Sequence, residues 1–275
     1  MSLSKQIKTI IMNLMAPKAH VPPILKTYEK ELKNLQRDYI SIKAKPLANK
    51  LSEDPLKLTK SKFLGFPFIP SGSEYPKDEN GKPMILIAQI NFSETPELTH
   101  FPSSGLLQLY FPADDWGDIG SEKILYHSST DLQKQPVSDF SFIDYAVYKE
   151  LPINKIHNLS FKKAIDTGCS EDSQFSLMFG TKDFGDFESD LHKNQKKEFY
   201  NYFSCSGHKI GGYATFTQGD PRDYSSKRKN DVQLLQIGID DFIMFGDSGV
   251  GHLFIHPDDL KAGNLEKAYF YWDCC

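Results

Sequence analysis

A glycine-rich stretch, FGDSGVGH at residues 245–252, holds the residue types that most readily suggest chemistry in this sequence. Its Gly-Asp-Ser-Gly core resembles the nucleophile loop of a serine protease, with Ser248 as the candidate nucleophile. However, Val250 stands where protease and hydrolase motifs need a glycine, and no histidine lies in a recognisable base motif. A phosphate-binding loop needs a helix after the glycines, whereas the residues from 252 onward alternate as a strand does. The stretch therefore predicts a turn between two strands, with its glycines in left-handed conformations.

Aspartates form a second group of candidate reactive residues. They cluster near two predicted strand ends, as Asp114, Asp115 and Asp118 in one place and as Asp240, Asp241 and Asp247 in another. Carboxylates brought together bind divalent cations or act as general acids and bases. Aspartate is also a preferred turn residue, and we favour that interpretation. The alternative is a hydrolase that uses Asp247 with Asp240 or Asp114 around a metal ion or a water molecule.

A third candidate is a recognition patch in GGYATFTQGDPRDY, residues 211–224, which mixes aromatic, amide and charged side chains near a predicted turn. An arginine between two aspartates more often forms a local ion pair than a substrate clamp, although such a surface also suits a protein partner. The candidate ligand or partner patch comprises Tyr213, Gln218, Asp220, Arg222 and Asp247.

Composition and cysteine spacing argue against several classes of protein. The chain has 32 Lys and Arg against 36 Asp and Glu, a net charge of −4, which offers no attraction for nucleic acid or anionic membranes. Cys169, Cys205, Cys274 and Cys275 lack zinc-ligand spacing, so we expect no metal and no other cofactor. No apolar run is long enough for a membrane span and no export signal is visible. We therefore expect a cytoplasmic protein in which Cys274 and Cys275 are free thiols.

Hydrophobic periodicity places the candidates on an α+β fold with mixed, largely antiparallel sheets, preceded by N-terminal helices. Helical spacing is seen at residues 5–15 and 22–38, and a polar helical stretch runs over about 186–202. Alternating or continuous apolar runs predict strands at 39–45, 84–90, 105–111, 123–127, 142–151, 233–237, 242–245, 252–255 and 268–273.

Two short motifs occur twice, which predicts an internal duplication. SKFLGFPFI at 61–69 parallels HKIGGYATF at 208–216, and GLLQLYFPADDWGD at 105–118 parallels QLLQIGIDDFIMFGD at 233–247. The first match aligns three pairs: Lys62 with Lys209, Gly65 with Gly212, and Phe66 with Tyr213. We therefore predict an N-terminal helical segment, 1–38, and a single α+β domain, 39–275, in which two similar halves, 39–150 and 205–275, are joined by a partly helical segment, 151–204.

The same motifs, in this order and followed by FGDSGVGHLFI, resemble the YwqG-like family, a group of bacterial proteins described as a domain of unknown function. The resemblance covers about residue 24 to the C-terminus; Phe245 stands where the family often has tryptophan. It implies an α+β fold and assigns no catalytic residues. Some members are encoded near toxin systems, so the resemblance also implies a possible immunity-like role.

These observations favour a non-enzymatic protein-binding module over an enzyme. No catalytic constellation is recognisable, and the resemblance points to a protein partner rather than to nucleic acid or a membrane. The Asp-based hydrolase is the alternative.

Overall fold

Ten antiparallel strands form one sheet in the computed structural model, which describes residues 21–112, 114–148 and 151–275. The strands lie side by side in the order β10-β9-β8-β7-β1-β6-β2-β3-β4-β5. Their bounds are β1 Arg37–Pro46, β2 Lys62–Phe63, β3 Ile85–Asn91, β4 Leu106–Phe111, β5 Lys123–His127, β6 His157–Asp166, β7 His208–Gly211, β8 Val232–Ile237, β9 Val250–Ile255 and β10 Tyr269–Asp273. The predicted antiparallel sheet is confirmed, as one continuous sheet.

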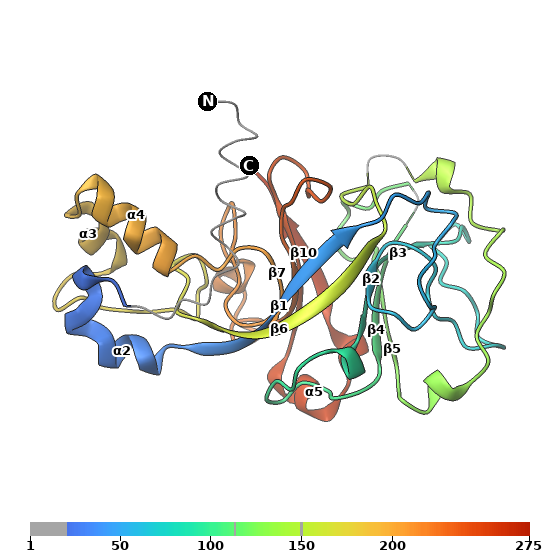
Figure 1. Cartoon of the computed structure of the whole chain (residues 1–275), viewed down its shortest axis with the longest axis horizontal. Helices are drawn as coiled ribbons and strands as arrows, with labels where there is room; N and C mark the ends of the chain where they lie inside the picture. The colour runs from blue at the N-terminus through green and yellow to red at the C-terminus, as the bar shows by residue number, and fades with distance from the viewer. Residues whose placement is uncertain (1–20, 113, 149–150) are drawn as a thin grey trace.

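Helices are few and short. They are α2 Glu29–Asn34, α3 Phe184–Ser189, α4 Lys193–Tyr202 and α5 Pro257–Ala262, and 3₁₀ turns lie at Pro23–Tyr28, Phe92–Glu94, Asp131–Gln133, Tyr145–Val147, Pro221–Tyr224 and Leu265–Lys267. Figure 1 shows α2, α3 and α4 together at one end of the molecule, beyond the sheet. We call these three helices, with the 3₁₀ turn before α2 and the loop from residue 167 to 183, the helical lobe.

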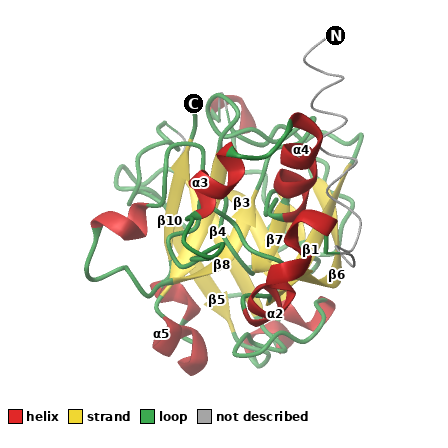
Figure 2. Ribbon diagram, turned by 90° about the vertical axis from the view of Figure 1, so that its left-hand side faces the viewer, coloured by secondary structure: helices red, strands yellow, loops and turns green. Residues whose placement is uncertain are grey.

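The sheet curls until its two ends approach each other (Figure 2). The Trp272 indole on β10 donates a hydrogen bond of 2.9 Å to the Gly117 carbonyl, which precedes β5. The Phe270 backbone N–H donates to the Glu122 carboxylate, also at 2.9 Å. The rings of Phe111 on β4 and Phe270 lie 4.8 Å apart. These contacts give the sheet a nearly barrel-like shape with an apolar interior.

Several predicted elements differ from the observed ones. The second N-terminal helix ends at Asn34 instead of Asp38, because β1 begins at Arg37; the helix predicted over 5–15 lies outside the described residues. The stretch predicted as one helix over 186–202 is two helices, because Asp183 and His192 each cap a separate N-terminus.

Two predicted strands are wrong in the part that the structure describes. Within 142–151 the Asp144 carboxylate accepts the Ala146 N–H and starts a 3₁₀ turn. Within 242–245 only isolated bridges form, from Ile243 to Ile153 and from Phe245 to Gly249. Strand β6 was not predicted. Its sequence HNLSFKKAID is largely polar, because one of its faces is exposed over most of its length.

The long strands β1 and β6 form the centre of the sheet and place the rest of it. They pair over their whole length, with Ser41 opposite Lys162 and Lys45 opposite Asn158. The outer edge of each long strand pairs with a short strand at an equivalent position. Lys209 of β7 lies opposite Ser41 of β1, and Lys62 of β2 lies opposite Asn158 of β6. The register on the two sides of the central pair is therefore related by an approximate twofold rotation.

The two lysines placed in this way form matching buried ion pairs. Lys62 Nζ lies 2.7 Å from Asp54 Oδ2, and Lys209 Nζ lies 2.8 Å from Asp166 Oδ2. Each carboxylate also accepts the backbone N–H four residues after its lysine, that of Phe66 at 2.8 Å or of Tyr213 at 2.9 Å. Burial lowers the pKa of both lysines, although the neighbouring carboxylates oppose this shift. Each pair thus ties the chain after a short strand back to the strand itself.

Matching glutamines extend these contacts into the neighbouring strands. Gln89 lies opposite Lys62 and Gln236 lies opposite Lys209. Each glutamine accepts one backbone N–H, from Phe68 or Thr215, and donates to two carbonyls, those of Leu58 and Lys60 or of Cys205 and Gly207. By these contacts, β3 on one side of the central strands occupies the position that corresponds to β8 on the other side. The Leu-Leu-Gln motif instead aligned Gln108 with Gln236, and that alignment is wrong because it compares β4 with β8.

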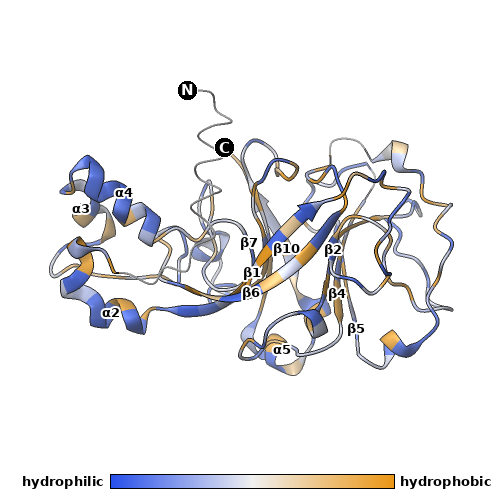
Figure 3. Cartoon of the chain, viewed as in Figure 1, coloured by the Kyte–Doolittle hydropathy of each residue, from blue (hydrophilic) through white to orange (hydrophobic). Residues whose placement is uncertain are grey.

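Apolar side chains fill the curled sheet and, separately, the helical lobe. The larger cluster lies inside the sheet and includes Ile87, Leu109, Phe111 and Leu253. The smaller cluster joins Leu25 and Leu32 to Phe175, Phe199 and Tyr213. In Figure 3 the middle of the central strands is hydrophobic, while α3 and α4 are mainly hydrophilic. The lobe is therefore held by a small core of its own.

The buried ion pairs lead to a prediction for stability. Substitution Lys209→Met leaves the Asp166 carboxylate buried without its cation, which should lower the free energy of unfolding by about 3–5 kcal/mol. Lys26→Met removes the exposed partner of Glu29 and should change it by about 1 kcal/mol or less. Urea denaturation of both variants measures the difference. Equal small losses would contradict a structural role for the buried pair.

A second prediction concerns pH. His252 lies opposite Gln236, as Gln108 lies opposite Gln89. Burial lowers the His252 pKa from 6.5 to about 3. Between these two pH values the imidazole is protonated in the unfolded chain but not in the folded chain. His252 therefore reduces stability as the pH falls from 6.5 toward 3, by up to about 1.4 kcal/mol per pH unit.

Gln108 on β4 occupies the position that matches His252 on β9. The substitution His252→Gln therefore introduces the residue found at the matching position, and it should flatten the dependence of the urea midpoint on pH between 6.5 and 4.5. His100→Gln alters an exposed imidazole and serves as the control. An unchanged slope in His252→Gln would show that other groups cause the acid sensitivity.

Candidate functional site

Ser248 lies in a tight turn and not in a catalytic arrangement. The Gly249 N–H donates to the Phe245 carbonyl at 2.8 Å, and both Gly246 and Ser248 have positive φ. Ser248 is exposed, and its hydroxyl donates to the Asp247 carboxylate next to it at 3.3 Å. The predicted turn is confirmed, although only β9 on its C-terminal side is a regular strand.

The predicted aspartate clusters do not form a metal centre in the described part of the chain. Asp114 pairs with Lys82, both on the surface. Asp240 is partly buried, accepts the Phe242 N–H and receives a hydrogen bond of 3.2 Å from the His208 imidazole. No group of three potential metal ligands among these residues includes Asp114, Asp240 or Asp247. Each of the three carboxylates thus has a local role in a turn, a surface pair or a histidine contact.

The five residues of the predicted patch divide into buried and exposed positions. Tyr213, Asp220 and Arg222 are buried, whereas Gln218 and Asp247 are exposed. The Gln218 backbone N–H donates to Asp273, and Asp247 lies in the Ser248 turn. The buried three can therefore influence a partner only through the residues that cover them.

Arg222 is the centre of a buried ion cluster below the surface. Its guanidinium contacts the carboxylates of Asp220 at 2.6 Å and Asp172 at 2.9 Å. It also donates to the Asp231 carbonyl at 2.8 Å. Although burial opposes the charge, these two carboxylates raise the pKa of Arg222 above its ordinary value. The cluster fixes the loop that carries Asp172 against the turn that carries Asp220.

A cavity of about 490 Å³ has Gln174, from the same loop as Asp172, in its lining. Its walls come from the start of β1, the loop at residues 98–101, the Gly211–Gly212 turn and α5, and Gln174 closes one side. Leu98, Phe101 and Leu260 supply apolar surface, while Arg37, Lys261 and His100 supply polar groups. A cavity of this size that combines apolar walls with a few polar groups is typical of ligand sites.

Arg37 is the best-positioned charged group of the cavity. Its guanidinium carbon lies 4.0 Å from the centre of the Tyr213 ring, and its Nη1 donates to Gln174 Oε1 at 3.2 Å. Gln174 is itself fixed, because its amide nitrogen donates to the carbonyls of Lys229 and Asp231. Stacking and hydrogen bonding together restrict the guanidinium, which reduces the entropy lost when it binds a ligand.

The charges around the cavity favour an anion. Arg37 and Lys261 contribute two positive charges to the lining. Asp38 supplies the only carboxylate among the described residues that line the cavity, and it pairs with Lys163 at 3.0 Å. Planar carboxylates match the fork of N–H groups on a guanidinium. The geometry is therefore suited to binding a carboxylate group.

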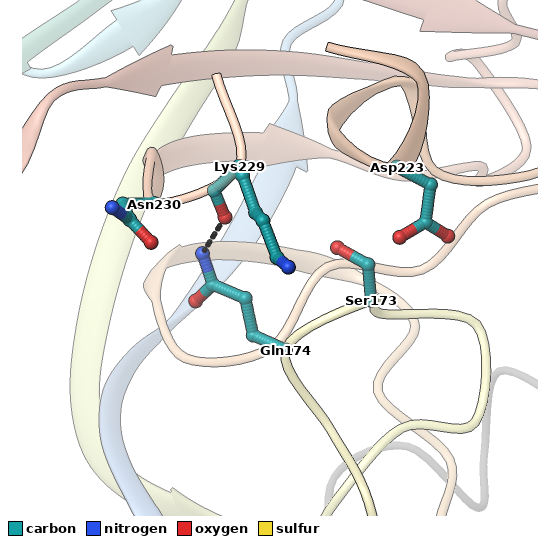
Figure 4. A pocket seen from close by; sticks show the side chains of 5 residues that line it. All are labelled: Ser173, Gln174, Asp223, Lys229 and Asn230. Atoms are coloured by element: carbon teal, nitrogen blue, oxygen red, sulfur yellow. Dashed lines mark hydrogen bonds between the residues drawn. The ribbon is translucent and has the colours of Figure 1, made fainter. Parts of the chain in front are cut away.

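A smaller hollow of about 260 Å³ lies on the other side of Gln174. Figure 4 shows the Gln174 amide directed at the Lys229 carbonyl, with Ser173 and Asp223 facing them across the hollow. Gln174 therefore separates two depressions, and only the larger one contains the oriented arginine. Arg37 and Gln174 could not be recognised in the sequence, because they are 137 positions apart and neither belongs to a motif.

Two of the four cysteines form a disulfide, which the sequence did not predict. Cys169 and Cys205 form a disulfide in the helical lobe, with a Cα–Cα distance of 5.8 Å. Cys274 and Cys275 are free, as predicted. The disulfide joins the loop after β6 to the segment that follows α4, so it holds the loop that carries Asp172 and Gln174.

Most of the chain matches one protein family. Residues 61–274 match the profile of a family described as Domain of unknown function (DUF1963). The chain belongs to this family. The DUF1963 domain includes every strand from β2 to β10, whereas β1 and Arg37 precede the matched residues. No curated protein matches the chain.

None of the helices in the described ranges combines the length and the apolar character that a bilayer span requires.

The turn beside the cavity leads to a third prediction. Gly212 has a φ of +74°, and an added Cβ would lie 2.1 Å from the Asp166 carboxylate. Gly180 has a similar φ of +68° with nothing within 4 Å of such a Cβ. Gly180→Ala should therefore cost only the conformational term of about 1–2 kcal/mol. Gly212→Ala should cost roughly 1–3 kcal/mol more, because the methyl group displaces the carboxylate.

The free energy of unfolding of the two glycine variants, measured by urea denaturation, tests this difference. Equal losses would mean that the close approach of Asp166 places no constraint on the turn.

Proposed function

We propose that this chain is a non-enzymatic binding protein that takes up a carboxylate group of a polypeptide partner in the cavity beside Gly211–Gly212. The observation that carries the proposal is the guanidinium of Arg37, which is held at the cavity by the Tyr213 ring and by Gln174. An acidic side chain or a C-terminal carboxylate has the shape and charge that this guanidinium binds.

The lining supports a binding role more than a catalytic one. Among the described lining residues, Arg37 and Lys261 are cations, and Gln36, Gln174 and Gln233 are neutral amides. The lining also includes the exposed His100 imidazole and the Asp38 carboxylate, which is paired with Lys163. Gln233 is already engaged, because its amide donates to the Gly211 carbonyl and its oxygen contacts the His252 imidazole. Such a set can hold and orient an anion. The hydrolase with clustered aspartates gains no support from the positions of Asp114, Asp240 and Asp247.

The proposal keeps the predicted patch but changes how it acts. Tyr213 supports Arg37 from below, and Arg222 and Gln174 both donate to the Asp231 carbonyl. Asp220 holds Arg222. Three of the five patch residues are thus linked to the cavity residues Arg37 and Gln174, directly, through the Asp231 carbonyl or through Arg222, while Gln218 and Asp247 lie outside the cavity lining.

We also propose that the domain arose by duplication. The matching ion pairs and glutamines on the two sides of β1 and β6 support the duplication. Leu64 occupies the position that matches Gly211, and both have positive φ. The Leu64 side chain is fully buried, whereas Gly211 lines the cavity. A leucine thus stands in the first half where the second half has a glycine, at which an added Cβ would lie 2.8 Å from Leu98 Cδ2.

The immunity-like role and the bacterial origin are proposed from the resemblance to the YwqG-like family. An immunity-like role is the specific form of the proposal in which the acidic segment belongs to a toxin. Bacterial origin rests on the same resemblance. The Cys169–Cys205 disulfide favours an oxidising compartment and so does not support the cytoplasmic expectation.

The binding proposal predicts a specific effect of Arg37→Ala. The probe is a fluorescein-labelled tetraglutamate peptide followed by fluorescence polarisation, with tetraglutamine as the uncharged comparison. Loss of a charge-assisted hydrogen-bonding pair should weaken tetraglutamate binding about tenfold or more. Arg37→Lys should also weaken it, because an ammonium lacks the planar fork.

Arg228 provides a matched control for this experiment. Its guanidinium also stacks on an aromatic ring, that of Tyr269 at 3.9 Å, but it does not line the cavity. Arg228→Ala should leave tetraglutamate affinity within about twofold, since exposed charges contribute little. Equal losses in the two variants, or equal affinity of wild type for tetraglutamine, would refute the proposed site.

A further inference from the structure

The cysteines of the helical lobe lie next to a carboxylate that the disulfide does not use. Cys169 Sγ, Cys205 Sγ and a Glu171 oxygen all lie within 4.8 Å of one another, and they are the one group of three possible metal ligands found among the described residues. The two cysteines are buried and Glu171 is exposed, so solvent reaches the group from the carboxylate side.

We propose that, when the disulfide is reduced, these three side chains form a binding site for a thiophilic divalent cation of the zinc type. Thiolates and carboxylates are both zinc ligands, at about 2.3 Å from sulfur and 2.0–2.2 Å from oxygen. Two thiolates on one tetrahedral ion are separated by about 3.8 Å. The Cα–Cα distance of 5.8 Å brings the two sulfurs within reach of one ion after the S–S bond has opened.

The surroundings hold the carboxylate in place for this role. Glu171 Oε2 accepts a hydrogen bond from the Phe216 N–H at 3.0 Å and another from the Thr215 hydroxyl. Cys205 Sγ lies 3.8 Å from the Ala214 carbonyl. Groups that orient metal ligands in this way commonly change metal affinity 10–100-fold when they are removed. With three protein ligands, the fourth position is left for water.

The disulfide and the metal-bound dithiolate are alternative states of the same two sulfurs. A water-soluble trialkylphosphine reduces the S–S bond to two thiols and becomes a phosphine oxide, with the oxygen and both protons supplied by water. Binding of the divalent cation then releases the two thiol protons, because thiolates are the ligands. Oxidation of the two thiolates by hydrogen peroxide, which takes up their two electrons and becomes two hydroxide ions, re-forms the disulfide and releases the ion.

The site is tested with Co²⁺, whose binding to thiolates gives a sulfur-to-metal charge-transfer band. Full-length protein is reduced with the phosphine under argon, freed of reductant and titrated with Co²⁺ and then with Zn²⁺. We expect one Co²⁺ per chain, with the charge-transfer band, and its displacement by Zn²⁺. The same chain with its disulfide intact should show no such band, and this comparison needs no substitution.

Variants assign the ligands. Cys169→Ser with Cys205→Ser should abolish the band, and Glu171→Gln should weaken Co²⁺ binding about tenfold or more, while Thr215→Val should weaken it roughly 10–100-fold. Cys274→Ser with Cys275→Ser removes the two free cysteines and should leave the band unchanged. A band that persists in the disulfide form, or that is lost only with Cys274 and Cys275, would overturn the proposal.

Discussion

Two buried lysine–carboxylate pairs are the constraint on which the rest of this fold depends. Lys62 with Asp54 and Lys209 with Asp166 lie on either side of the central strands β1 and β6. A buried charge without a partner is very unfavourable, so each lysine requires its aspartate to lie close by. Since each aspartate also holds a backbone N–H beyond the lysine, the pair sets the path of the chain after each short strand.

The candidate site follows from the second of these pairs. Asp166 holds the backbone of Tyr213, so the Gly211–Gly212 turn must pass over the carboxylate, where a side chain on Gly212 would not fit. The ring of Tyr213 then supports Arg37 at the edge of the cavity. A buried structural interaction in the sheet is thereby connected, through one aromatic ring, to the only oriented cation found along the described walls of the cavity.

The helical lobe links the cavity to cysteine chemistry. Its loop carries Cys169, Glu171, Asp172 and Gln174 within six positions. Asp172 is fixed by Arg222, and Gln174 contacts Arg37. A change of state at the cysteines therefore takes place on the same short loop that forms one wall of the cavity. The proposed anion site and the proposed metal site are separate in their ligands but share this segment.

Local pattern in the sequence by itself determined the antiparallel strands, the turn at Ser248 and the correspondence of Lys62 with Lys209, because alternation, glycine and short motifs act over a few residues. It did not determine β6, whose exposed face hides its alternation, or the correspondence of β3 with β8 on the two sides of the sheet. It also did not reveal the cavity, since Arg37, Gln174 and Tyr213 come from three distant segments, or the disulfide between Cys169 and Cys205. Those features depend on contacts between residues far apart in the chain, and only the packing of the whole sheet and lobe brings them together.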